Sequence, residues 1–214
     1  MPPVTASASA DLHAAYLDHL AGSGRGNTAY WQAARVFFRR WSDPQRWAEQ
    51  PLTARLSAGS ATRPIITFLM LHGVLRPGYD YLLERKLSSI WRDIKDSPLG
   101  SDLDRFMATA AELGFTERVR FATGSQVPAR LLIQTGRRLD QLRIADLDVF
   151  TAACHDRHAR TGKGHQHYLA AVSNAQRVLF HLGIVDQLPR SGGPVPFAER
   201  LAEVRPPIRD TMIA

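Results

Sequence analysis

The stretch 65–75, IITFLMLHGVL, constrains the fold more than any other part of the chain because it is almost entirely apolar. A helix that is apolar on every side must be buried on every side. At about eleven residues, this stretch is far shorter than the ~18–20 needed to cross a bilayer. Pro64 suits a first helical turn, and Gly73 suits a helix end. The sequence therefore predicts a buried, central helix of a soluble domain.

Amphipathic helices account for most of the remaining sequence. Between residues 28 and 41, apolar and aromatic side chains recur every three or four positions, with polar side chains opposite them. Segments with strand-like alternation are nearly absent, so we predict an all-α protein. The apolar stripe consists of Tyr30, Ala34, Phe37, Phe38 and Trp41, and further helices are expected at 12–20, 51–56, 79–95, 102–113, 147–158 and 168–182.

The order of elements before residue 96 recurs after residue 100. The segment 177–184, RVLFHLGI, repeats the apolar helix and its terminal glycine, and DSPLG at 96–100 is the best candidate boundary. We therefore predict two tandem small helical bundles. The expected parts are a disordered lead at 1–10, a first bundle at 11–96, a second bundle at 101–190, and a Pro/Gly linker with the start of a truncated segment at 191–214.

Composition limits the class of partner and the compartment. The chain has a net charge of +7 and a pI near 10.2, so a polyanion such as a nucleic acid is a reasonable partner. Only three of the 27 basic residues are lysine, a bias that suits phosphate and guanine recognition but that a GC-rich genome also produces. The single cysteine excludes an internal disulfide framework. Without a signal-peptide pattern or an apolar run of membrane length, we expect a cytoplasmic protein without a membrane partner.

Three sequence features resemble the core-binding domains of tyrosine recombinases, the phage-integrase superfamily. The first is a short helix and a loop followed by a segment with Thr28, Trp31, Arg35 and the run FFRRW at 37–41. The second is the pattern LRIADLDVF at 142–150, a turn followed by Asp-aliphatic, two residues and Phe. The third is the final apolar helix that contains Arg177. The segments 62–64, 68–73 and 76–80 also look like the N-terminal part of large actinobacterial-type integrases.

The resemblance implies SAM-like helical bundles that grip recombination-site DNA, with other recombinase protomers as further partners. It does not extend to catalysis. The family cleaves DNA through a tyrosine nucleophile and has a His-x-x-Arg element, but none of the eight histidines here has arginine three positions later. The five tyrosines end at Tyr168, too early for a C-terminal nucleophile. We therefore expect DNA binding without catalytic residues, without a cofactor and without a small-molecule substrate.

The expected DNA contacts lie on polar helix faces and in one basic loop. Arginine and lysine neutralise phosphates, and Gln or Arg can read base edges. The alternative for each is an ordinary solvated face. The candidate residues are Thr28, Gln32, Arg35 and Arg39 on one helix face, Arg63 at the start of the central helix, and Arg130, Arg157, Arg160, Lys163, Ser173 and Arg177 in the second half.

Other chemistry is less well supported by the sequence. Cys154, His155, His158, His165 and His167 suggest a zinc site, but Cys154 and His158 continue an apolar stripe, so we predict no metal. The aromatic stripe at 30–41 is expected to be core and not a base-stacking platform. The glycine-rich loops at 22–26 and 162–164 lack P-loop spacing. The alternative functions are a protein-interaction module that assembles through the apolar 79–91 helix, and a small α-helical transcription regulator.

Overall fold

The computed structural model describes residues 6–23 and 28–189, and within these ranges the chain is helical and contains no strand. The all-α prediction is therefore confirmed. No helix in these ranges is both long enough and apolar enough to span a membrane. The elements are α1 (Ala6–Gly22), α2 (Thr28–Arg40), α3 (Gln45–Ala48), α4 (Leu52–Leu56), α5 (Arg63–Leu71), α6 (Tyr79–Glu84), η1 (Leu87–Ile90), α7 (Trp91–Lys95), α8 (Gly100–Glu112), α9 (Glu117–Gln126), α10 (Pro128–Thr135), η2 (Leu139–Gln141), α11 (Ile144–Thr161) and α12 (Gln166–His181).

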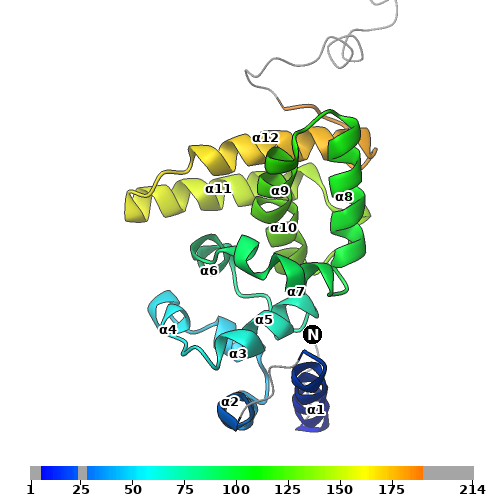
Figure 1. Cartoon of the computed structure of the whole chain (residues 1–214). Coiled ribbons are helices and arrows are strands. Elements are labelled where there is room, and N and C mark those ends of the chain that lie inside the picture. The colour runs from blue at the N-terminus through cyan, green and yellow to red at the C-terminus, as the bar shows by residue number, and fades with distance from the viewer. Residues whose placement is uncertain (1–5, 24–27, 190–214) are drawn as a thin grey trace, which may run out of the picture.

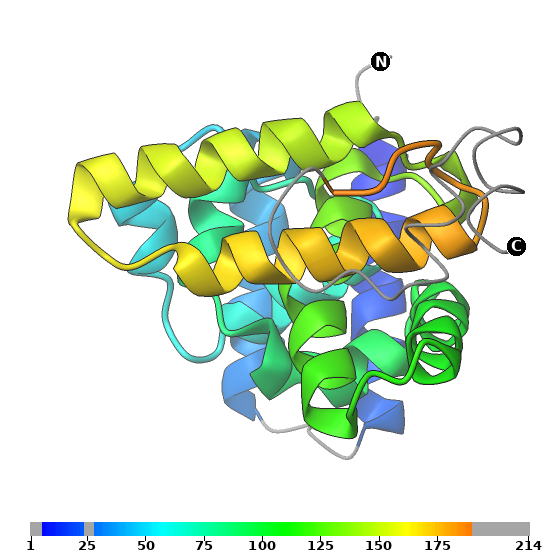
Figure 2. The same cartoon turned by 90° about the horizontal axis from the view of Figure 1, so that it is seen from above.

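The two ends of the molecule are helix pairs. Helices α1 and α2 contact each other at one end, and α11 and α12 contact each other at the other end (Figure 1). The view from above shows α11 and α12 lying side by side across the helices beneath them (Figure 2). Helices α5, α6, α7 and α10 lie between the two pairs (Figure 1). Surface features on α2 and on α11–α12 are therefore far apart.

Helix α5 is the buried central helix that the sequence predicts. Pro64 lies in its first turn, where a missing backbone N–H costs nothing. Every residue of 65–71 is buried. Gly73 has a φ of +71°, the left-handed conformation that ends a helix, and the N–H of Val74 donates to the carbonyl oxygen of Leu69 at 2.9 Å.

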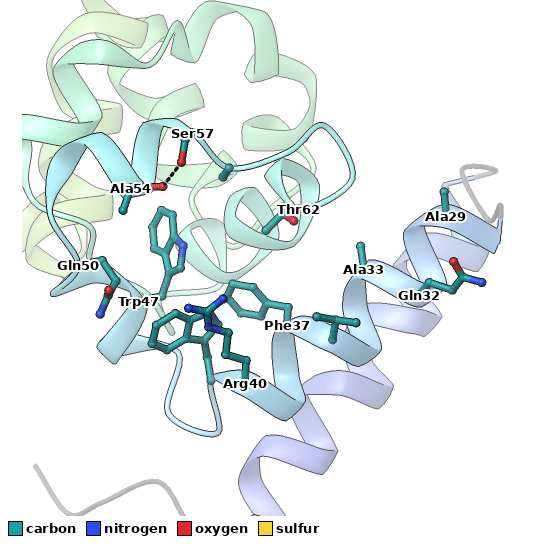
Figure 3. A pocket seen from close by; sticks show the side chains of 13 residues that line it. Ala29, Gln32, Ala33, Phe37, Arg40, Trp47, Gln50, Ala54, Ser57 and Thr62 are labelled. Carbon is teal, nitrogen blue, oxygen red and sulfur yellow. Dashed lines mark hydrogen bonds between the residues drawn. The ribbon is translucent and has the colours of Figure 1, made fainter.

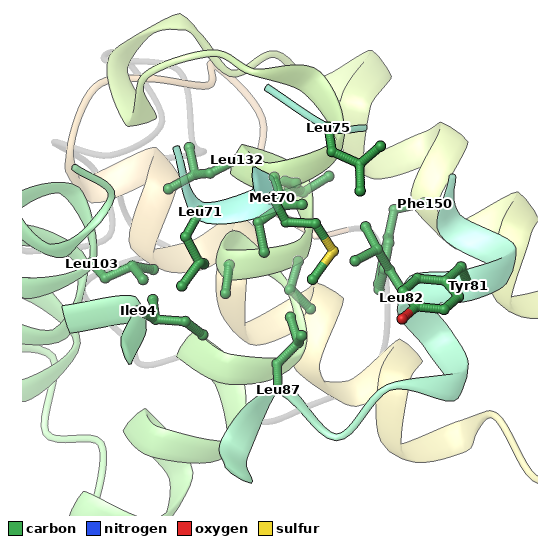
Figure 4. Packing of buried hydrophobic residues seen from close by; sticks show 14 of the residues in the cluster. Met70, Leu71, Leu75, Tyr81, Leu82, Leu87, Ile94, Leu103, Leu132 and Phe150 are labelled. Atoms are coloured by element: carbon green, nitrogen blue, oxygen red, sulfur yellow. The ribbon is translucent and has the colours of Figure 1, made fainter. Parts of the chain in front are cut away.

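The buried side chains form one continuous core that crosses the predicted domain boundary. Met70 and Leu82 from the first half pack in the same cluster as Leu132 and Phe150 from the second half (Figure 4). The segment 96–100 is a tight turn in which the N–H of Gly100 donates to the carbonyl of Ser97 at 2.9 Å. The described residues therefore share one core, and the predicted bundle limits do not coincide with a gap in it.

The expected single helix at 79–95 is wrong. The chain forms α6, the 3₁₀ turn η1 and α7, because Arg85 adopts an extended conformation with a ψ of 134°. Of the expected lead at 1–10, residues 6–10 belong to α1. Residues 1–5 and the predicted linker at 191–214 lie outside the described residues.

Candidate nucleic-acid interface

Helix α2 presents an exposed polar stripe. Its four predicted DNA-binding side chains are spaced by four, three and four positions, which places them on one side of a helix, and all four are exposed. The helix has no Asp or Glu, and neither arginine of the stripe forms an ion pair with another described residue. The stripe, which we call the α2 stripe, consists of Thr28, Gln32, Arg35 and Arg39.

The opposite side of α2 anchors the stripe to the core. Ala34, Phe37 and Phe38 are buried. The Phe38 ring lies 5.3 Å from the ring of His13 and 6.4 Å from the ring of Tyr16, centroid to centroid, so α2 is fixed against α1. The prediction that the aromatic stripe is core is confirmed for the two phenylalanines. This packing determines which face of α2 is exposed to solvent.

A groove of about 580 Å³ runs beside the α2 stripe (Figure 3). Its lining includes Gln32 from the stripe, Val36, which is 54% exposed, and Phe37 on α2. Thr62, which directly precedes Arg63, also lines it. The groove therefore links the α2 stripe to the start of α5.

Arg63 is the first residue of α5 and is exposed, as predicted. Its Nε donates to the carbonyl oxygen of Ala58 at 3.1 Å, which leaves the terminal nitrogens available to a ligand. A helix N-terminus carries partial positive charge, so a guanidinium there adds to a local preference for anions. The structure thus brings Arg63 close to the groove that the stripe flanks.

Arg130 is not a DNA contact in this structure, because its side chain is buried. Nε donates to the carbonyl of Leu82 at 2.9 Å, and Nη2 donates to that of Arg85 at 2.7 Å. Nη1 donates to the carbonyl of Ser125 at 2.8 Å. Burial lowers the pKa of Arg130 to about 10, so the guanidinium stays protonated at neutral pH. Arg130 ties α6 to the end of α9 by satisfying carbonyls that the helix ends leave free.

Arg157 is also buried, contrary to the prediction of a DNA-facing loop residue. Its Nε donates to Oε1 of Glu84 at 2.9 Å. Lys163 is exposed, and its Nζ donates to Oε2 of the same carboxylate at 2.7 Å. Arg160, in the last turn of α11, is exposed as expected. The basic segment 157–163 is therefore partly bound to Glu84 and only partly free.

The two remaining predicted residues lie on α12. Ser173 and Arg177 are half-buried, and Nε of Arg177 is shielded from solvent without an acceptor among the described residues. Helix α12 begins at Gln166, so Arg177 does not lie at a helix start as Arg63 does. The apolar side of α12 packs into the core, with Tyr168, Ala175 and Leu179 buried. These two polar residues share no surface with the α2 stripe.

The Cys/His segment at 154–167 does not form a metal-binding group among the described residues. Cys154 is fully buried, and burial raises the pKa of its thiol to about 11, which disfavours the thiolate that a metal needs. The His155 and His158 rings lie 4.9 Å and 4.3 Å from the His165 ring. Nδ1 of His158 is bonded to the backbone carbonyl of Lys163 at 2.9 Å. These histidines close the α11–α12 turn.

The apolar side chains of segment 79–91 differ in burial. Tyr81, Leu82, Leu83 and Leu87 are buried in the core. Tyr79, Ile90 and Trp91 are half-buried and pack against it.

Several residues near the candidate sites were missed. Trp31, 48% exposed, lies one turn before Arg35 on α2, and an exposed tryptophan is an unusual feature. Glu84, Arg85 and Lys86 form a charged triplet at the end of α6, after two leucines. That triplet is a visible signal of a helix end, but the partners of Glu84, which are Arg157 and Lys163, lie more than 70 positions away in the chain.

Comparison of the chain with models of protein families, with curated proteins and with solved structures found no match.

Proposed function

We propose that this chain binds double-stranded DNA through the α2 stripe and the start of α5, as the DNA-gripping part of a site-specific recombinase of the tyrosine type. The observation that carries the proposal is the α2 stripe itself. It is an exposed row of two arginines, a glutamine and a threonine on a helix without a carboxylate. The proposal is limited to binding and assigns no catalytic step to the chain.

The dimensions of α2 suit a DNA groove. A helix of 13 residues is about 20 Å long, and the major groove is about 12 Å wide, enough to admit a helix. Arg35 and Arg39 have planar donor forks that match guanine or phosphate oxygens. Gln32 can form two hydrogen bonds with adenine, and Thr28 at the helix start can donate to a phosphate.

The sequence resemblance supports the same surface. The segment that resembles the core-binding domains of tyrosine recombinases includes Thr28, Arg35 and Arg39. The net charge of +7 favours encounter with DNA. We also propose that the protein is cytoplasmic and that it contacts other recombinase protomers.

The test uses fluorescence anisotropy to measure binding of the full chain to labelled duplex DNA over a range of salt concentrations. Each phosphate neutralised contributes about −0.9 to the slope of log K against log salt. We expect a steep loss of affinity between low and moderate salt. Absence of binding to any duplex at low salt would refute the proposal.

A further inference from the structure

A second basic site lies where the end of α6 meets α9, α10, α11 and α12. It is a pocket of about 370 Å³. Among the described residues that line it, five side chains are basic and one is a carboxylate, Glu84. The basic residues come from four separate parts of the chain, so the tertiary fold and not a local run creates the charge. They are Arg85, Lys86, Arg130, Arg157 and Lys163.

The backbone that forms one wall of the pocket is held in place. Arg130 binds the carbonyls of Leu82 and Arg85, at 2.9 and 2.7 Å. The hydroxyl of Tyr168 donates to the carbonyl of Leu83 at 3.2 Å. Three carbonyls within four residues are thus fixed by buried side chains, so the position of Glu84 between them is fixed too. A rigid wall reduces the entropy cost of binding a ligand.

The carboxylate of Glu84 shows how the pocket holds an oxyanion. Oε1 accepts from Nε of Arg157 at 2.9 Å, and Oε2 accepts from Nζ of Lys163 at 2.7 Å. Two oxygens of a phosphate group present the same pair of acceptors, and charge-assisted bonds of this length are the strong ones. The two cations therefore already converge on an anionic group.

The pocket has more positive charge than Glu84 can balance. Arg85 and Lys86 form no ion pair with another described residue. His167 also lines the pocket, and burial together with the charges of Arg157 and Arg130 lowers the pKa of His167. Like charges held this close favour the uptake of a further anion.

We propose that this pocket binds a phosphate group, with Arg157 and Lys163 as its main ligands and Glu84 as an internal competitor for both. Lys86 lies on the adjoining turn and supplies a further cation. The pocket is larger than one phosphate group, so it has room for part of the molecule that bears it. The phosphate belongs either to a nucleic acid or to a small phosphorylated molecule. This inference does not depend on DNA binding by the α2 stripe.

The test measures binding of inorganic phosphate and pyrophosphate to the full chain by isothermal titration calorimetry at constant ionic strength. We expect saturable binding to the wild type. Lys163→Ala removes one charge-assisted hydrogen bond and should weaken binding about tenfold. Glu84→Gln removes the competitor and should strengthen binding about tenfold. Lys95→Ala is the matched control, because Lys95 is exposed, pairs with Asp104 and lies outside the pocket.

Two results would overturn the inference. One is the absence of saturable binding to both the wild type and Glu84→Gln. The other is an equal loss of affinity in Lys163→Ala and Lys95→Ala. If Glu84→Gln does not fold, Lys163→Ala still tests the proposal, because the Lys163 side chain is 56% exposed.

A competition arm distinguishes the two sources of phosphate. Displacement of pyrophosphate by duplex DNA supports a nucleic-acid phosphate, whereas pyrophosphate binding that persists at saturating DNA supports a small phosphorylated molecule. Arg35→Gln/Arg39→Gln separates this site from the proposed DNA surface. That double variant should bind pyrophosphate like the wild type, even if duplex binding is lost.

Discussion

Gly73 and Gly183 end α5 and α12 in the same backbone conformation, each with a φ of +71°. In both places the residue after the glycine donates its N–H to a leucine carbonyl five positions earlier, at 2.9 Å, from Val74 to Leu69 and from Ile184 to Leu179. This is the Schellman arrangement, which satisfies carbonyls that a helix end leaves free. The repeat seen in the sequence is therefore a repeat of local structure.

Replacing either glycine with alanine should destabilise the protein. A side chain in the left-handed region costs about 1–2 kcal/mol, so Gly73→Ala and Gly183→Ala should each lower the free energy of unfolding by about that amount. Urea denaturation measures the change. Gly59→Ala is the control, because Gly59 does not have a positive φ and an added Cβ meets no atom within 4 Å. Equal stability of all three variants would contradict the assignment.

The continuous core predicts a single unfolding transition. Three of the four tryptophans, Trp31, Trp41 and Trp47, report the first half of the chain by fluorescence, and Trp91 reports the contact with α9, since its ring lies 5.2 Å from that of Phe121. Far-UV circular dichroism reports every helix. The two denaturation curves should coincide, as in two-state unfolding. Gly100→Ala should shift both curves together, because its Cβ would lie 2.0 Å from the carbonyl oxygen of Lys95. A second phase seen only by circular dichroism would instead indicate two independent bundles.

Arg130 should stabilise the folded protein. Arg130→Ala leaves the carbonyls of Arg85 and Ser125 without the Arg130 donor and removes one of the two donors of the Leu82 carbonyl, which also accepts from the Arg85 N–H. We expect a loss of about 3 kcal/mol in the free energy of unfolding. Arg118→Ala removes an exposed arginine of α9 and should change stability by less than about 0.5 kcal/mol. Chemical denaturation of both variants tests this difference. Similar stabilities would show that Arg130 does not hold α6 to α9.

The free energy of unfolding should decrease as the pH is lowered from about 7.5 to about 5.5. Burial, together with the neighbouring His19, lowers the pKa of His72 below its ordinary value of 6.5. The unfolded chain therefore binds more protons in that window, and unfolding becomes easier between about pH 7.5 and about pH 5.5. The pKa values of His165 and His167 are also lowered, with burial as the first cause. Urea midpoints at the two pH values should show the loss, and His72→Gln should reduce it. A midpoint that stays constant or rises toward pH 5.5 would contradict this.

The helices that the sequence predicts well are those whose apolar pattern alone determines their burial. Helix α5 is apolar on all sides, and α2 has a clear stripe, so local sequence is sufficient to place both. The break after Glu84 was missed because Arg130, 45 positions away from Arg85, binds the Arg85 carbonyl. No local pattern in 79–95 contains that information.

The sequence predicts only the part of the candidate site whose exposure depends on local pattern. The residues of the α2 stripe are exposed as expected, since the opposite face of α2 is strongly apolar. Arg130 was expected on a polar helix face and Arg157 in a basic loop, and arginine is almost never fully buried without a partner. Their partners are distant backbone carbonyls and Glu84, which only the tertiary fold brings together.

The salt dependence of duplex binding by Arg35→Gln/Arg39→Gln tests the proposed DNA surface. If each arginine contacts a phosphate, the slope of log K against log salt should become shallower by about one for each arginine removed. Arg105→Gln/Arg118→Gln removes the same charge from exposed positions on α8 and α9 and should keep the wild-type slope. A slope in Arg35→Gln/Arg39→Gln equal to that of the wild type would contradict DNA binding through α2.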